Sequence, residues 1–219
     1  MGYARWLGHA AFELSIDGVR FLIDPWISNP LSPVKIDELK NVDLILVTHD
    51  HFDHLGETVE IARKTSAQVL SVPELSNYLK EQGLNTIGMN IGGSVEFKGL
   101  KIVMTQAFHT SSRGSPVGYV VTGRESSIYH AGDTGLFGDM KLIGELYKPK
   151  ISLLPIGGYY TMSVNEALVA IDLIKPEVVI PMHYNTFPVI KADPERFREL
   201  ASSKGVKCII LKPGESYTF

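Results

Sequence analysis

The first part of the chain alternates apolar and polar residues, which is the pattern of half-buried β-strands. The alternation runs from Ala4 to Ile23, and the pair Asp17-Gly18 interrupts it as a hairpin turn would. A short apolar run follows, LILV at residues 44–47, which is typical of a strand buried on both faces. The pattern therefore predicts a β-meander followed by a buried strand.

Apolar residues with helical spacing begin after this strand. Residues 57–67 and 75–82 are predicted as helices, with a short strand at 68–72 between them. Strand patterns return over residues 90–130, including a hairpin at 97–109. The alternation then resumes, with helices expected at 139–147, 164–174 and 194–203 and strands at 151–156, 178–182 and 208–213.

The two halves of the chain thus repeat one order of elements, a β-meander and then strands alternating with helices. Two packed sheets with helices on their outer faces accommodate this order. We therefore expect an α/β fold, an αββα four-layer sandwich, as a single domain over residues 1–219. The ends of strands from both sheets should meet along one edge, where a ligand would bind.

Composition and charge narrow the class of protein. Apolar residues make up 44% and charged residues 21%, as in ordinary globular domains. No run approaches the roughly 18 apolar residues of a membrane span, so we expect neither a membrane partner nor export. The net charge of −3 comes from well-mixed charges without a basic cluster, so nucleic acid is not an expected partner. The single cysteine, Cys208, lies in a predicted strand and fits a reducing cytoplasm.

Titratable residues are concentrated in one segment, VTHDHFDHLG at residues 47–56. Five of its side chains are of types that bind metals: His49, Asp50, His51, Asp53 and His54. Three further candidates each follow a predicted strand elsewhere in the chain: His109, Asp133 and His183. A single histidine on a strand is more often structural than a ligand, but this ordered set favours a metal centre.

The order His-x-His-x-Asp-His, then His, Asp and His, resembles the metallo-β-lactamase superfamily over essentially the whole chain. The resemblance implies two divalent metal ions, most simply zinc. One would be held by His49, His51 and His109, the other by Asp53, His54 and His183, with Asp133 bridging them. Manganese, iron, nickel or cobalt would suit the same ligands.

The implied chemistry is metal-assisted hydrolysis. Three imidazoles leave zinc an open position for water, and a bound metal lowers the pKa of that water to about 7. The resulting hydroxide, oriented with the help of Asp53, would cleave a small ester, lactone or phosphoester. The charge of two divalent ions outweighs that of Asp53, Asp133 and a hydroxide, so the substrate should be a small anionic or carbonyl-bearing molecule.

Four further motifs resemble a branch of uncharacterised metal-dependent hydrolases that includes the ascorbate-6-phosphate lactonase: WLGHAAF, FLIDPW, YHAGDTGLF and PMHYNTFP. His9, in the first motif, matches the N-terminal histidine of that branch and would position substrate or donate a proton, unless it is a core histidine. Tyr159 and Tyr160 stand where the branch often carries polar residues, which puts the lactonase substrate in doubt. With Tyr184 they would form an aromatic wall, and at most one of the adjacent pair needs to face the site.

Supporting roles are expected for four residues that the resemblance does not make ligands. Asp50 should bind backbone or orient an imidazole, and Asp24 and Thr48 should support the ligands. His130 is either a core residue or a group that supports a ligand.

Three other functions compete with hydrolysis of a small molecule. A ribonuclease or other nucleic-acid phosphodiesterase would need an added domain and a basic patch, which 219 residues do not offer. A diiron oxidoreductase resembling flavodiiron proteins would carry a carboxylate in place of His51. A non-catalytic metal-binding or sensing protein has no need of a complete ligand set. The oligomeric state is left open.

Overall fold

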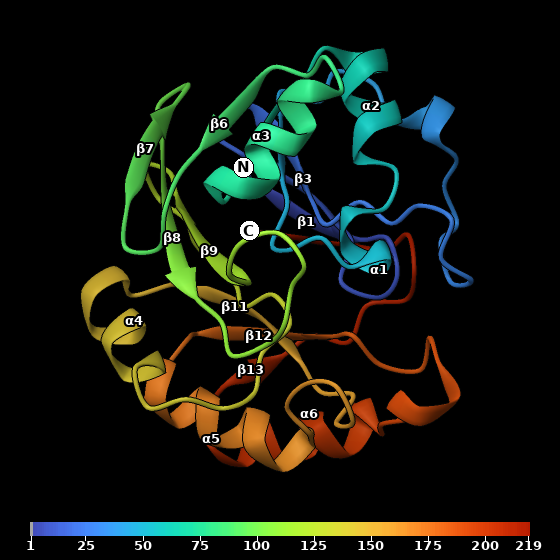
Figure 1. Ribbon diagram of the computed structural model, residues 1–219. Coiled ribbons are helices and arrows are strands. Elements are labelled where there is room, and N and C mark those ends of the chain that lie inside the picture. Colours follow the sequence, from blue (N-terminus) through green and yellow to red (C-terminus); the bar gives the residue numbers. More distant parts are fainter. Residues whose placement is uncertain (1) are drawn as a thin grey trace.

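Two β-sheets pack face to face between layers of helices in the computed structural model, which describes residues 2–219 (Figure 1). The helices α2 and α3 cover one sheet, and α4, α5 and α6 cover the other, on the opposite side of the molecule. The expected α/β fold, the αββα sandwich, is confirmed. Within the described residues each sheet has seven strands.

The first sheet combines an antiparallel and a parallel half. Its order is β14-β1-β2-β3-β4-β5-β6, in which β1, β2 and β3 form the predicted meander and β3 to β6 run parallel. The strands span β1 Tyr3–Trp6, β2 Phe12–Ile16, β3 Val19–Ile23, β4 Leu44–Leu46, β5 Gln68–Ser71, β6 Thr86–Gly88 and β14 Ser216–Thr218. Asp17 and Gly18 both have positive φ, 51° and 83°, as the tight turn between β2 and β3 requires.

The second sheet repeats this plan. Its order is β13-β12-β11-β10-β9-β8-β7, antiparallel from β7 to β10 and parallel from β10 to β13. The strands span β7 Ser94–Phe97, β8 Leu100–Gln106, β9 Val117–Thr122, β10 Ser127–His130, β11 Ile151–Pro155, β12 Val178–Met182 and β13 Lys207–Cys208. The predicted repeat of a meander followed by strand-helix alternation is therefore confirmed.

Five of the helices lie where the apolar spacing predicts them. They span α2 Thr58–Thr65, α3 Pro73–Glu81, α4 Met140–Tyr147, α5 Val164–Ile174 and α6 Pro194–Ser203. Ser163 and Glu166 form a capping box at the start of α5, and Asp193 caps α6. The sequence pattern did not predict α1, Phe52–Leu55, because four residues are too few to show a helical period. Two short 3-10 helices, η1 Ile36–Glu38 and η2 Pro188–Ile190, complete the elements.

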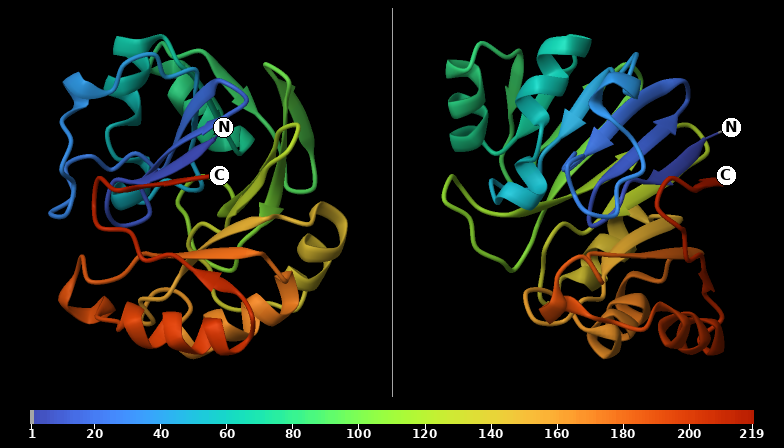
Figure 2. Two further views of the ribbon diagram at one scale, coloured as in Figure 1. Left: turned by 180° about the vertical axis from the view of Figure 1, so that it is seen from behind. Right: turned by 90° about the vertical axis from the view of Figure 1, so that its right-hand side faces the viewer.

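The end of the chain differs from the expected strand over residues 208–213. The parallel strand stops at Cys208, after which the chain leaves the second sheet and crosses to the first. There β14 pairs antiparallel with β1, and Gly2 and Phe219 exchange two backbone hydrogen bonds, so the two ends of the chain lie side by side (Figure 2). The C-terminal segment therefore ties the two sheets together.

The core lies mainly between the sheets. The parallel strands β4, β11 and β12 are buried throughout, as expected for strands covered on both faces. Large buried side chains from both sheets meet there, among them Phe12, Phe21 and Tyr119, whose hydroxyl donates to the carbonyl oxygen of Val47 after β4. Cys208 is buried as well, and burial raises its pKa to about 12, so it is not a nucleophile. No helix within residues 2–219 is long and apolar enough to cross a membrane.

Candidate metal centre

The candidate metal ligands come from five segments that end at one edge of the sandwich. His49 follows β4, the α1 segment supplies three ligands, and His109, Asp133 and His183 follow β8, β10 and β12. Gly132, with a φ of +63°, allows the turn before Asp133 to pack tightly, because a Cβ at this position would overlap the carbonyl oxygen of Val117 and lie 3.2 Å from the side chain of Thr48. Residues far apart in the sequence thus form one cluster.

Three imidazoles form what we call the first cluster: His49, His51 and His109. The Nδ1 atom of His51 lies 3.0 Å from Nε2 of His49 and 3.3 Å from Nε2 of His109. Nitrogen ligands of a tetrahedral zinc, at about 2.0–2.1 Å from the metal, are about 3.3–3.4 Å apart. The spacing of these three nitrogen atoms therefore fits a metal ion between them.

A second group brings together His9, Asp53, His54 and His183, and we call the three expected ligands among them, Asp53, His54 and His183, the second cluster. Asp133 lies between the two clusters. One of its oxygen atoms is 3.2 Å from Nε2 of His54, and the other is 3.0 Å from Nε2 of His183 and 3.5 Å from Nε2 of His109. This carboxylate is placed to contact a metal in either cluster.

Two polar atoms at the centre fit a metal better than they fit the protein around them. Among the described residues, neither Nε2 of His54 nor Oδ1 of Asp133 has a hydrogen-bond partner of good geometry, although both are buried and lie 3.2 Å from each other. An unsatisfied buried polar atom is costly, and each such atom calls for an explanation. Metal coordination would satisfy both atoms.

The charge states also suit metal binding, which needs neutral imidazole and ionised carboxylate. Burial lowers the pKa of His49 and His109, so both rings are neutral near pH 7. Burial opposes ionisation of Asp133, but the imidazoles of His183 and His54 hold its pKa well below the usual range. Burial also opposes protonation of His54, but Asp133 and Asp24 raise its pKa. His54 is thus protonated near pH 7 when no metal is bound, and this proton would leave when the ring binds a metal.

Asp24 orients an imidazole in each cluster. It is fully buried after β3, and its Oδ2 accepts a hydrogen bond from Nδ1 of His54 at 2.7 Å and from Oγ1 of Thr48 at 2.6 Å. Because the Thr48 hydroxyl donates to Asp24, it accepts from Nδ1 of His49 at 3.0 Å. Both imidazoles therefore turn Nε2 toward the metal position, an arrangement typical of metal-binding histidines.

His9 lies behind Asp53 and does not line the open cavity. Its Nε2 donates to Oδ2 of Asp53 at 3.1 Å, and its Nδ1 lies 3.0 Å from Oγ1 of Thr186. Burial lowers the pKa of His9 to about 4, so the ring is neutral and has one proton to donate. Burial opposes ionisation of Asp53, but the hydrogen bond from His9 lowers its pKa. This geometry favours a positioning role for His9, and its role in turnover stays a prediction.

Three residues with unusual backbone conformations surround the clusters. His9, Asp24 and His183 have φ values of 53°, 48° and 54°, in the left-handed region that non-glycine residues rarely adopt. Such conformations are costly and persist where the surrounding structure holds them, often at functional sites. Their concentration here supports this edge as the functional site.

Asp50 and His130 each take one of the two roles expected of them, Asp50 by binding backbone and His130 as a core residue. Asp50 does not orient an imidazole: it accepts hydrogen bonds from Ser111, Ser112 and Arg113 and so holds the loop that follows His109. His130 is a buried structural residue. Its Nε2 donates to the carbonyl oxygen of Ala10 and its Nδ1 accepts from the backbone of Gly132, next to Asp133.

A cavity of about 430 Å³ opens onto the two clusters. Its lining comprises the ligands His51, Asp53, His109, Asp133 and His183 together with Phe52, Thr110, Tyr160 and Phe187. Of the three tyrosines expected in an aromatic wall, only Tyr160 lines the cavity. Tyr159 is 74% exposed, and the expectation for Tyr184 was wrong, because it is buried and stacked on Trp6 at 5.4 Å. Phe52 and Phe187 were missed, since a phenylalanine in a motif has no signal that separates a cavity wall from core.

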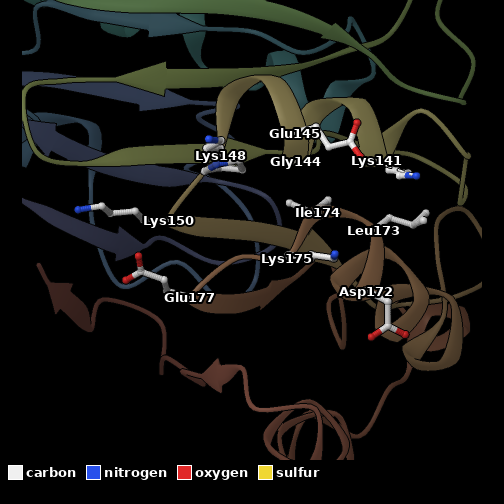
Figure 3. A pocket seen from close by; sticks show the side chains of 11 residues that line it. Lys141, Gly144, Glu145, Lys148, Lys150, Asp172, Leu173, Ile174, Lys175 and Glu177 are labelled. Atoms are coloured by element: carbon white, nitrogen blue, oxygen red, sulfur yellow. Dashed lines mark ion pairs between the residues drawn. The ribbon is translucent and has the colours of Figure 1, made fainter.

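A larger cavity, of about 600 Å³, lies between α4 and the end of α5 (Figure 3). Lysines and carboxylates alternate around it, and none of the described residues that line it is a histidine or a cysteine. Two of its lysines, Lys148 and Lys175, are the left-handed residues that end the two helices. Charged side chains at the ends of two packed helices explain this cavity as a helix-helix junction. The residues that could bind a metal lie instead at the edge of the sandwich described above.

The αββα sandwich with this ligand set at its edge defines a metal-dependent hydrolase of the metallo-β-lactamase fold. Residues 19–184 match the profile described as "Beta-lactamase superfamily domain", and the chain belongs to this family. It is 60% identical over 220 residues to a UPF0173 metal-dependent hydrolase of Caldivirga maquilingensis, covering 98% of this chain and 97% of that protein. It is 54% identical over 223 residues to one of Thermofilum pendens, covering 98% of each.

A solved structure agrees with these relatives. Igni18, described as a novel metallo hydrolase from the hyperthermophilic archaeon Ignicoccus hospitalis, is 45% identical to this chain and superposes with a TM-score of 0.95. The match covers 100% of this chain and 99% of Igni18. The expected enzyme class, a metal-dependent hydrolase, is thereby confirmed.

Proposed function

We propose that this protein hydrolyses a small ester, lactone or phosphoester at a dinuclear centre, with zinc as the first candidate metal. In this proposal His49, His51 and His109 hold one ion, and Asp53, His54 and His183 hold the other. The observation that carries the proposal is the position of Asp133, whose oxygen atoms lie 3.0–3.5 Å from imidazoles of both clusters. A carboxylate in this position is expected of a bridging ligand.

Two divalent ions, when bound, supply a water of lowered pKa as the nucleophile and polarise the oxygen of the scissile bond. The remaining chemistry belongs to the protein. Asp133 and Asp53 supply negative charge that offsets part of the charge of the metals. Asp24 keeps the ring nitrogens of His54 and, through Thr48, of His49 directed inward. His9 holds the carboxylate of Asp53 in one orientation.

The proposed substrate is a small molecule in the cytoplasm, and polymeric nucleic acid is not a substrate. A duplex or single strand is bound largely through its phosphates, by lysine and arginine side chains. Among the described residues that line the cavity, none is basic apart from the metal-ligand histidines.

The test begins with metal analysis of protein purified without a histidine tag. Two zinc ions per chain are expected. A content of one ion or none per chain after saturation with zinc would contradict a dinuclear centre. A panel of lactones, carboxylic esters, thioesters and phosphodiesters is then assayed, with His49→Ala as the inactive control. If the protein cleaves RNA efficiently and this activity depends on His49, the small-molecule assignment is contradicted. If protein with two bound metals turns over no compound of the panel, the hydrolase mechanism is contradicted.

A further inference from the structure

One wall of the cavity is made of exposed aromatic rings. Phe52, Tyr160 and Phe187 line it, and Phe52 and Tyr160 are 68% and 51% exposed. Phe52 lies between the ligands His51 and Asp53, at the first position of α1. Large apolar side chains gathered on an open surface are unfavourable in water, and such patches commonly mark a binding site.

The wall is held in place from behind. Trp26, which is buried, stacks on Phe187 with ring centroids 5.7 Å apart and meets Phe52 edge-on at 5.5 Å. Phe52 and Phe187 also contact each other at 6.4 Å. Edge-on and offset aromatic pairs are the favoured geometries, so the rings lose little freedom when a ligand binds. Phe52 and Phe187 are therefore pre-organised, while Tyr160 packs edge-on against the exposed Tyr159 at 4.8 Å.

The cavity offers no positive side chain to an anionic group on a substrate. Among the described residues that line it, none is lysine or arginine, and apart from the metal ligands the polar groups are the hydroxyls of Thr110 and Tyr160. Arg113, on the loop after His109, is committed elsewhere, since it pairs with Asp50 at 2.9 Å and lies over the ring of Tyr78 at 4.0 Å. A carboxylate or phosphate away from the metals would therefore lose water without gaining a positively charged partner.

We propose, resting on the hydrolase function above, that this cavity selects a neutral substrate with an aromatic or bulky aliphatic group beside the scissile carbonyl. The metals take the carbonyl, and the wall of Phe52, Tyr160 and Phe187 takes the apolar group. Substrates with a phosphate or carboxylate in place of that group are disfavoured. The specificity of the enzyme is set by these three rings.

Hydroxamic acids separate the wall from the metals, because the same metal-binding head can carry different tails. Three probes are titrated calorimetrically into the zinc-loaded protein: acetohydroxamate, 3-phenylpropanohydroxamate and the monohydroxamate of succinate. Burial of a phenyl group should make the second probe bind about 10- to 100-fold tighter than the first. The succinate probe should gain nothing over acetohydroxamate.

Two adjacent tyrosines provide a matched pair of variants. Tyr160→Ala removes a ring that lines the cavity, whereas Tyr159→Ala removes a ring that does not. Both side chains are exposed, so both variants should fold. Tyr160→Ala and Phe187→Ala should each cut the advantage of the phenyl tail by about 3- to 10-fold with acetohydroxamate binding unchanged. Tyr159→Ala removes only the edge-on neighbour of Tyr160, so its effect should be clearly smaller. Metal content is measured for every variant.

Three outcomes would each overturn the aromatic-wall proposal and leave the hydrolase function standing. The three probes could bind equally tightly, the succinate probe could bind most tightly, or Tyr159→Ala and Tyr160→Ala could have equal effects. Failure of every hydroxamate to bind a protein with two metals would instead overturn the accessible metal centre, and the wall proposal with it.

Discussion

The two ligand clusters use similar side chains in different surroundings. In the first cluster, His51 and His109 are partly exposed at the cavity, and no carboxylate belongs to the set. In the second, His54 and His183 are buried and Asp53 adds a carboxylate directly supported by His9. A buried carboxylate attracts a metal cation more strongly than three neutral imidazoles near water do. The second cluster should therefore hold its metal more tightly than the first.

The largest effect should follow from removing the carboxylate that both clusters share. Asp133→Asn keeps the shape of the side chain but removes its charge, so both metals lose a common ligand. Turnover should fall at least about 1000-fold, and the metal content should drop toward one ion, retained by the second cluster. Elemental analysis and kcat on the best ester of the panel measure this. Two metals with near-normal turnover would show that Asp133 is not shared.

Asp53→Asn should affect the second cluster alone. Asp53 is not the cap of the following helix, since the residue at the N-cap of α2 is Glu57, so the change costs no capping interaction. The apo-protein should melt as wild type does, while turnover falls about 100-fold or more through loss of a negatively charged ligand. Melting temperature and turnover are measured together for Asp53→Asn and Asp53→Ala. Near-wild-type turnover in Asp53→Asn would reduce the centre to one secure metal.

A pair of supporting variants should distinguish the clusters. Asp24→Asn disturbs the imidazole orientation in both, and asparagine tolerates the left-handed backbone at this position. Thr48→Val removes the acceptor of His49 and one hydrogen bond to Asp24, but it keeps the bond from Asp24 to His54. In competitive chelator titrations, Asp24→Asn should weaken metal affinity about 10- to 100-fold at both metal positions. Thr48→Val should weaken it by a similar factor at the first cluster only.

Asp50→Asn is the matched control for this pair. Its carboxylate belongs to the same motif but binds the loop of residues 111–113, so metal affinity should stay at the wild-type level. Equal losses in Asp24→Asn and Asp50→Asn would mean that any charge change in this segment weakens the metals, and the proposed orienting role of Asp24 would fall.

The smallest effect is expected at His9. His9→Asn keeps a residue that accepts positive φ but is too short to reach Asp53. Both metals should remain, kcat should fall about 10-fold and KM should change less, because the main loss is the hydrogen bond that orients Asp53. An unchanged kcat in a variant with two metals would assign His9 a purely structural role.

Much of this centre can be predicted from the sequence because its information is local. The period of two in residues 4–23, the buried run LILV and the helical spacing each depend on neighbours in the chain, and the structure bears them out. Since His49, His109, Asp133 and His183 each follow a strand, their approach at one edge also follows from the order of the elements. Short elements carry too little period, which is why α1 and the crossing to β14 were not predicted.

Contacts between segments distant in sequence were decided only by the tertiary structure. Asp24 and Asp50 are both aspartates near the same motif, yet one orients imidazoles and the other holds a loop, because each depends on which segment packs beside it. Tyr184 and Tyr160 are equally aromatic, but one stacks on Trp6 in the core and the other lines the cavity. The sequence by itself determined the ligand types and their order, which are set by coordination chemistry and strand periodicity. Only the packing of the two sheets decided which side chains support those ligands and which ones face the substrate.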